Sequence, residues 1–265
     1  TDSYNTPLIA AVIKNYPKIV ELLINFPKTD INLRDINDDS ALIIAVKSSN
    51  YQICNLLLKS EKFDSIESKI DYSFYLATNE TAKTLTSYKS LDVNFIYTID
   101  CTHQEVFIPE ESKKTSLIKA VENNDIEKIE LIVNHHSFNK DKSNINKAIF
   151  IAAKRNNIIV FKQLLKIIND DISIHLNDNN ESLLITSAKN LSGEIIDDIL
   201  NRPQFDPSSN QILDAFIFSY ISFESKQNNQ QWNGWIHHPQ NLNLIPNKIT
   251  KVEMMNKIYD YDKAN

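Results

Sequence analysis

Short apolar segments recur along this chain, and most open on a small or polar residue and contain one alanine. The clearest copies are TPLIAAV at 6–12, SALIIAV at 40–46, TSLIKAV at 115–121 and KAIFIAA at 147–153. Weaker copies are YSFYLAT at 72–78, ESLLITS at 181–187 and NQILDAF at 210–216. A small polar residue favours a helix start, and the apolar spacing places the large side chains on one face. Each copy therefore predicts a short amphipathic helix.

A second apolar segment follows most of these predicted helices. It reads IVELLI at 19–24, ICNLLL at 53–58, IELIV at 129–133, VFKQLL at 160–165 and IIDDIL at 195–200. The chain after it tends to read Asp, a β-branched residue and then Asn or a polar substitute, as at 30–32, 92–94 and 171–173. The predicted unit is a helix, a tight turn, a second helix and an extended arm.

The spacing of the units is regular except at one place. The aligned small residues are Ala11, Ala45, Ala77, Ala120, Ala152, Thr186 and Ala215, and the intervals between them are 34, 32, 43, 32, 34 and 29 residues. The long interval contains an insertion at about 96–113. Its segments NFIYTI and EVFIP have the composition of strands and flank the turn-like DCTHQ, which predicts a β-hairpin that projects from the arm.

These units resemble the ankyrin repeat, which has about 33 residues and a T-P-L-H-x-A helix start. TPLIAAV carries that start, with Ile9 in place of the histidine. The resemblance implies an all-α fold, an ankyrin-like α-solenoid of about seven helix-turn-helix repeats with short β-hairpin arms over residues 1–225. It is specific in the first, second, fourth and fifth repeats. Residues 226–265 match no repeat, and we expect them to form a capping segment.

Ankyrin repeats normally carry glycine between their two helices, where the backbone is left-handed. This chain has asparagine there, at Asn15, Asn124, Asn156 and Asn190. Asparagine is the next most tolerant residue for that conformation, so we expect positive φ at Asn15, Asn124 and Asn156. Ser49 and Thr81 hold the place in the second and third repeats, which predicts strained or irregular turns there.

Composition excludes several functional classes. The 265 residues are 42% hydrophobic and 23% charged, which is typical of a folded chain. The net charge of −6 gives no general attraction to nucleic acid. The two glycines, Gly193 and Gly234, argue against a P-loop, a dinucleotide-binding turn and a nucleophile elbow. No apolar run is long enough for a membrane span, and two cysteines predict a reducing, cytoplasmic location.

The insertion also carries the most suggestive chemistry, because Cys101, His103 and Glu105 alternate along it. On a strand they share one face, but side chains two residues apart start about 7 Å from one another, too far for a thiolate and its base. A structural zinc ion needs four ligands. We therefore predict no catalytic, cofactor or metal site, and expect the hairpin, with His103, to contact a partner.

The resemblance to ankyrin repeats implies a non-enzymatic protein–protein interaction module. Its concave groove is built from arm tips and the ends of the first helices. The groove charge is expected to be basic at both ends and acidic in the middle, with Arg155 as an anchor. Carried over position by position, the expected partner-binding residues are Lys14, Lys47, Ser48, Asn79, Glu80, Glu122, Asn123, Lys154, Arg155 and Lys189, besides His103.

The expected partner is another protein, bound by a monomer that needs no cofactor. The strong use of Asn, Ile and Lys resembles that of ankyrin proteins from AT-rich genomes, including intracellular bacteria, which suggests an effector directed to host cytosol. Two alternatives stay open. The repeats could target a catalytic domain outside this sequence, or a small Cys/His site could form within 96–113.

Overall fold

The computed structural model describes residues 6–97, 114–168, 181–190, 192–200 and 202. Within these ranges the chain forms twelve α-helices in consecutive pairs. The first helices of the pairs are α1 (Pro7–Ile13), α3 (Ala41–Lys47), α5 (Ile70–Leu76), α7 (Ser116–Glu122), α9 (Ile145–Lys154) and α11 (Leu183–Lys189). The second helices are α2 (Pro17–Asn25), α4 (Tyr51–Leu58), α6 (Asn79–Thr86), α8 (Ile126–Val133), α10 (Ile158–Leu165) and α12 (Gly193–Leu200).

This architecture confirms the predicted all-α fold of helix-turn-helix repeats. Six pairs lie in the described ranges, whereas the seventh predicted start at 210–216 and the predicted capping segment at 226–265 lie outside them. None of the described helices is long and apolar enough to cross a lipid bilayer.

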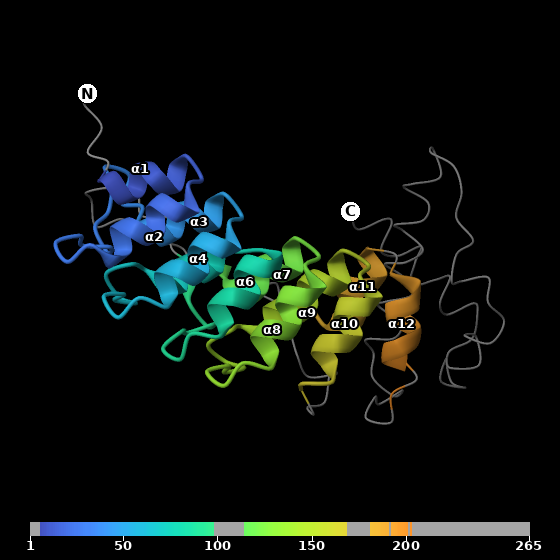
Figure 1. The fold of residues 1–265 in the computed structure, drawn as a ribbon. Coiled ribbons are helices and arrows are strands. Elements are labelled where there is room, and N and C mark those ends of the chain that lie inside the picture. The colour runs from blue at the N-terminus through green and yellow to red at the C-terminus, as the bar shows by residue number, and fades with distance from the viewer. Residues whose placement is uncertain (1–5, 98–113, 169–180, 191, 201, 203–265) are drawn as a thin grey trace, which may run out of the picture. The chain divides into compact units, whose positions relative to one another are not determined.

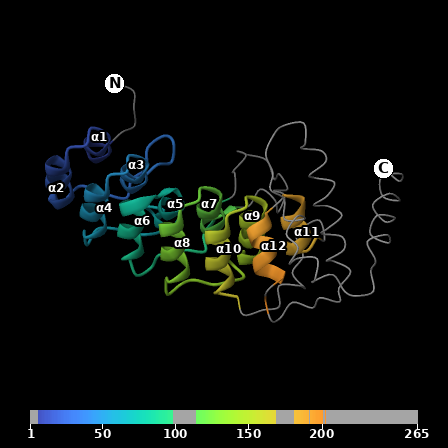
Figure 2. The same cartoon turned by 90° about the vertical axis from the view of Figure 1, so that its right-hand side faces the viewer.

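The chain divides into two compact units, an N-terminal unit of residues 1–145 and a C-terminal unit of residues 146–265. In the N-terminal unit the first helices α1, α3, α5 and α7 contact one another in sequence, and so do the second helices α2, α4, α6 and α8. Figures 1 and 2 show these two rows side by side. In the C-terminal unit α12 packs on α10 and α11. Each repeat buries apolar surface mainly against its neighbours.

Small polar residues begin four of the first helices, α1, α3, α7 and α11, whereas α5 follows Lys69, has no side-chain cap and starts before the predicted Tyr72. The hydroxyl groups of these N-cap residues accept a hydrogen bond from the backbone N–H three residues later, which satisfies one otherwise unpaired donor of the first turn. The N-caps are Thr6, Ser40, Thr115 and Ser182, with N···O distances of 3.1, 3.2, 3.1 and 3.3 Å.

The turns between paired helices are left-handed at the predicted residues. Asn15, Asn124 and Asn156 have φ of 55°, 56° and 54°, and Ser49 has φ of 53°. The following N–H then returns to the carbonyl of the aligned alanine, as from Asn50 to Ala45 at 2.9 Å. Such a bond satisfies a carbonyl at the helix end.

The prediction for the sixth repeat is wrong by one residue. Asn190 has φ of −97°, because this repeat starts at Ser182 rather than at Glu181. The returning hydrogen bond confirms the shift, since the N–H of Ser192 reaches the carbonyl of Ser187 at 2.9 Å, not that of Thr186. The position that aligns with the left-handed asparagines is therefore residue 191, which lies outside the described ranges.

The third repeat is irregular, as the sequence predicts. Its first helix α5 ends at Leu76, and Ala77 is extended with φ −63° and ψ 150°. The positive φ moves to Asn79, at 48°, and Thr81 lies inside α6 instead of in the turn. The turn between this pair of helices is thus two residues earlier than in the other repeats.

Asparagine side chains join successive arms, which explains the recurring Asp, β-branched, Asn pattern. Asn94 is 5% exposed. Its amide nitrogen donates to the Ser137 carbonyl at 2.6 Å, and its amide oxygen accepts from the Asn139 N–H at 2.8 Å and the Ser143 hydroxyl at 2.6 Å. Asp92 orients it by accepting from both the backbone and the side-chain nitrogen of Asn94.

Asn32 has the same role at an earlier junction between arms. Its amide donates to the Lys62 carbonyl at 2.8 Å and accepts from the Asp64 N–H at 2.9 Å and the Ser68 hydroxyl at 2.8 Å. The β-branched residue before each asparagine, Ile31 or Val93, is fully buried. One short motif thus supplies an apolar contact and a set of inter-repeat hydrogen bonds.

The arms carry little strand structure in the described ranges. Arg34 and Ser40 form an isolated antiparallel bridge in the first arm. At the flanks of the insertion, β1 (Ile96–Tyr97) pairs antiparallel with β2 (Lys114–Thr115), in the register Ile96 to Thr115. The predicted hairpin tip, with Cys101, His103 and Glu105, lies outside the described residues, so the hairpin stays a prediction.

Replacing Asn94 by Ala should destabilise the protein by about 2–4 kcal/mol, because it leaves a carbonyl, an N–H and a hydroxyl without partners in a buried junction. Chemical denaturation measures this change. Asn55→Ala is the control, since half-buried Asn55 takes no part in this junction. An equal loss in both variants would contradict the stabilising role assigned to Asn94.

Two neighbouring serines should respond to glycine in opposite directions. Ser49→Gly should raise the free energy of unfolding by about 0.5–1 kcal/mol, because it removes the left-handed strain of a residue with a Cβ. Ser48→Gly should lower it by a similar amount, because Ser48 has φ of −89° and its hydroxyl bonds the Ile44 carbonyl. Denaturant titrations of both variants decide the outcome; equal signs would refute the assignment of strain.

Candidate functional site

The expected partner-binding residues of most repeats occupy one shared position at the end of a first helix. Lys47, Glu122, Lys154 and Lys189 are the last residues of their helices, and Lys14, Ser48, Asn123 and Arg155 come directly after theirs. Most of these side chains are exposed, while Glu122 and Lys189 are half-buried. Seven of the ten described residues belong to the N-terminal unit and three to the C-terminal unit.

Two of the expected residues take a different place. Asn79 and Glu80 form the first turn of the second helix α6, because the early turn of the third repeat shifts them past the end of α5. Both are exposed. His103 lies outside the described residues, so nothing tests its role in binding.

Three of the charged residues that are predicted to line the groove form ion pairs. Lys47 pairs with Asp39 at 2.5 Å, Glu122 with Lys114 at 2.7 Å, and Lys189 with Glu181. The partners are always eight residues apart, because one precedes the N-cap and the other ends the same first helix. The polarity is reversed in the fourth repeat, where the cation comes first. The pairs neutralise much of the charge alternation that the sequence alone predicts.

An aromatic cluster lies between two of these ion pairs in the N-terminal unit. We call Tyr72, Tyr75, Phe95 and Tyr97 the aromatic platform. Tyr97 stacks on Tyr72 with centroids 5.5 Å apart and on Tyr75 at 5.0 Å, while Phe95 lies 6.2 Å from Tyr72 and 6.3 Å from Tyr75. Tyr75 is buried, and the other three rings are half-buried. Helix α5 and the strand that leads into the insertion therefore share one aromatic surface.

The electrostatics place the predicted groove residues beside this platform. Burial raises the pKa of Tyr72, an effect that Lys47 opposes and Asp39 reinforces. Burial also raises the pKa of Tyr75, and the carboxylate of Glu122 adds to that rise. Helices α3 and α7, which end at Lys47 and Glu122, both contact helix α5, which carries Tyr72 and Tyr75.

Lys119 adds a cation to the platform. Its ammonium nitrogen lies 4.1 Å from the centroid of the Tyr75 ring, a cation–π geometry. Burial, and then the charge of Lys114, lower the pKa of Lys119. Tyrosine is enriched among the few residues that carry most of the binding energy at protein interfaces. The platform is therefore the strongest candidate binding site among the described residues of the N-terminal unit.

Sequence reasoning missed this platform because it treated YSFYLAT only as a weak helix start. A signal was present, since Tyr72 stands where the other aligned copies place Thr, Ser, Lys, Glu or Asn, and Tyr97 follows the arm directly. The antiparallel pairing of β1 with β2 then places Tyr97 opposite Lys114.

A buried lysine holds the irregular third repeat. Lys128 of α8 is 3% exposed. Its ammonium group donates to the carbonyls of Phe74, Tyr75 and Ala77 at 2.7, 3.2 and 2.6 Å, and it lies 5.0 Å from the Phe74 ring. These carbonyls end α5, where the chain is extended at Ala77 and the left-handed residue is shifted to Asn79. Three donors therefore meet three acceptors at a helix C-terminus that also attracts a cation.

The position of Lys128 is apolar in other repeats. Counted from the N-cap of the second helix, it corresponds to Ile53 in α4 and to Val160 in α10, both fully buried. Burial lowers the pKa of Lys128 to about 7. A charged residue at such a site is retained because it satisfies backbone groups that an apolar side chain leaves unpaired.

The other titratable side chains considered, Cys54 and His135, have structural roles. Cys54 is fully buried, and burial raises the pKa of its thiol to about 12, so it is a core residue and not a nucleophile. His135 Nδ1 accepts a hydrogen bond from the Ser137 N–H at 3.2 Å and lies 2.8 Å from the Ser137 hydroxyl. Burial, and then the charge of His136, lower the pKa of His135. The described ranges contain no cluster of three or more side chains suited to a metal ion.

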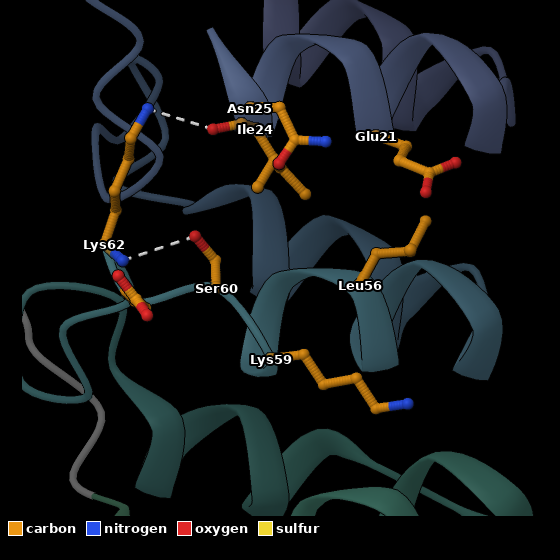
Figure 3. Close-up of a pocket in the computed structure, with 8 residues that line it drawn as sticks. Glu21, Ile24, Asn25, Leu56, Lys59, Ser60 and Lys62 are labelled. Atoms are coloured by element: carbon orange, nitrogen blue, oxygen red, sulfur yellow. Dashed lines mark hydrogen bonds between the residues drawn. The ribbon is translucent and has the colours of Figure 1, made fainter. Parts of the chain in front are cut away.

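An open pocket of about 370 Å³ lies between α2 and α4 (Figure 3). Its lining includes Ile24 and Leu56 with Glu21 and Lys59. Lys62 closes one end, because its ammonium group donates to the carbonyls at 24, 26 and 29 at 2.9, 2.6 and 3.4 Å. The pocket lies in the row of second helices. The hydrogen bonds of Lys62 satisfy carbonyl groups at the end of α2 and just after it. It offers no convergent set of polar groups for a small ligand.

Two comparisons with known proteins agree with this fold. Residues 1–69 match the family model described as ankyrin repeats in three copies. The crystal structure of the ankyrin repeat domain of Bcl-3, described as a unique member of the IκB protein family, is similar at a TM-score of 0.52 and 22% identity. The match covers 69% of this chain and 77% of that one, and at this identity it shows the fold alone. A search of curated proteins found no match.

Lys128→Met should lower the free energy of unfolding by about 2–4 kcal/mol, because the apolar stem stays buried while three carbonyls lose their donor. The matched control is Lys62→Met, which removes three similar bonds at a half-buried site and should cost less. Denaturant titrations compare the two. A smaller loss at Lys128 than at Lys62 would contradict this account.

The pH dependence provides a second readout for Lys128. Its pKa in the folded protein, about 7, lies below the ordinary value of 10.5. Between these values the unfolded chain holds a proton that the folded protein has released, so the free energy of unfolding rises with pH. This contribution should be present in the wild type and absent from Lys128→Met.

Proposed function

We propose that this chain, an ankyrin-repeat protein, is a non-enzymatic module that binds another protein through the ends of its first helices and the aromatic platform. Ankyrin repeats generally serve protein–protein interaction, and their fold is typically non-enzymatic. The observation that carries the proposal is the platform of Tyr72, Tyr75, Phe95 and Tyr97, flanked by Lys47 and Glu122 in the N-terminal unit.

The geometry supports binding along several repeats. Ordered ion pairs beside an aromatic centre present fixed charges to a partner and lose little side-chain entropy when it binds. The exposed residues at the same first-helix position, such as Lys14 and Asn123, extend the surface to either side of the platform in that unit. Lys154 and Arg155 occupy the equivalent position in the C-terminal unit.

The cellular setting belongs to the proposal as well. The strong use of Asn, Ile and Lys supports an origin in an AT-rich genome, and the low cysteine content supports a reducing compartment. We place the protein in cytoplasm, and in host cytosol as an effector. Monomeric binding to a single protein partner is the simplest form of this function.

Affinity capture from cytosol, read by quantitative mass spectrometry, tests the function. One variant carries Tyr72→Ser and Tyr97→Ser, and a second carries Lys154→Glu and Arg155→Glu. The matched control carries Lys18→Glu and Lys83→Glu, two exposed lysines on second helices. We expect a captured protein that falls about tenfold or more in at least one test variant and stays constant in the control.

Circular dichroism of each variant checks that the helices are retained. The variant with Lys154→Glu and Arg155→Glu should stay folded, because both substitutions replace exposed side chains. Equal capture by the wild type and both test variants would refute the binding surface.

A further inference from the structure

We propose that the aromatic platform with Lys119 recognises an acidic side chain next to a large apolar side chain in an extended segment of the partner. This inference rests on the proposed function and adds the chemistry of what is bound. It follows from the one cation at the platform that has no counter-charge among the described residues.

The local charges are unequal. Lys47 and Lys114 each pair with a carboxylate, at Asp39 and Glu122. Lys119 forms no ion pair within the described residues, and its lowered pKa shows that burial and Lys114 make its charge costly. A carboxylate placed beside Lys119 would offset that cost, whereas a cation would be repelled by both lysines.

The chemistry favours a carboxylate over a phosphate group. Sites for phosphorylated segments typically use clustered arginines, whose planar guanidinium groups bind phosphate oxygens in pairs. The cations around the platform are lysines, and two of the three are already neutralised. One ammonium group with one remaining charge matches a single carboxylate.

The rings define the second element of the recognition. Tyr72 and Tyr97 are half-buried and stack face to face with an interplanar angle of 20°, so part of their aromatic surface stays accessible. Such a surface binds a large apolar or aromatic side chain by burying its area. Lys119 lies over Tyr75, which stacks on the same Tyr97 ring. The carboxylate and the apolar group therefore fit neighbouring residues of one partner segment.

Selection of a random peptide library on the whole protein tests this inference. We expect peptides selected on the wild type to be enriched in Asp or Glu beside an aromatic or large aliphatic residue. Lys119→Met keeps the apolar stem and should lose the acidic enrichment. Lys83→Met, which removes an exposed lysine of α6, should keep it.

A selected peptide then gives the magnitude. Replacing its acidic residue by the matching amide should weaken binding to the wild type about tenfold and leave binding to Lys119→Met unchanged. Selected peptides without acidic enrichment, an enrichment that persists in Lys119→Met, or no selected peptides at all would each overturn the inference. The capture experiment on cytosol is independent of peptide chemistry, so it still reports on the proposed function in those cases.

Discussion

The structure depends on the inability of a single repeat to satisfy its own polar groups. Two short helices and an arm leave carbonyls and N–H groups without partners, and burial makes each of these expensive. The next repeat supplies the partners, through Asn32 and Asn94 between arms and through the N-cap hydroxyls of Ser40 and Thr115, which donate to carbonyls 28 residues later. Apolar packing holds the helices together, and these hydrogen bonds fix their register.

Lys62 and Lys128 show the same constraint at helix ends. Each ammonium group meets three carbonyls of an earlier repeat, at the ends of α2 and α5. The irregular turn of the third repeat leaves Asn79 and Glu80 in α6, and Lys128 at a normally apolar position accommodates that irregularity. The aromatic platform belongs to the same repeat. The departure from the repeat pattern and the candidate binding surface therefore coincide.

This coincidence gives the proposed function a physical basis. The third repeat presents Tyr72 and Tyr97 with Lys119 from its neighbour, which provides shape and charge at one point. Specificity arises where a site discriminates between partners as well as attracts one.

The sequence alone determined most of the helix pairs, the N-caps Thr6, Ser40 and Thr115 and the left-handed Asn15, Asn124 and Asn156, because hydrophobic period and backbone preference are local properties. It misplaced Asn190, since the sixth repeat is degenerate and a shift of one residue leaves the apolar pattern almost unchanged. The ion pairs of Lys47 and Glu122, the buried state of Lys128 and the platform were decided by tertiary structure. Each joins residues from separate elements, and only the packing of neighbouring helices and strands determines which side chains meet.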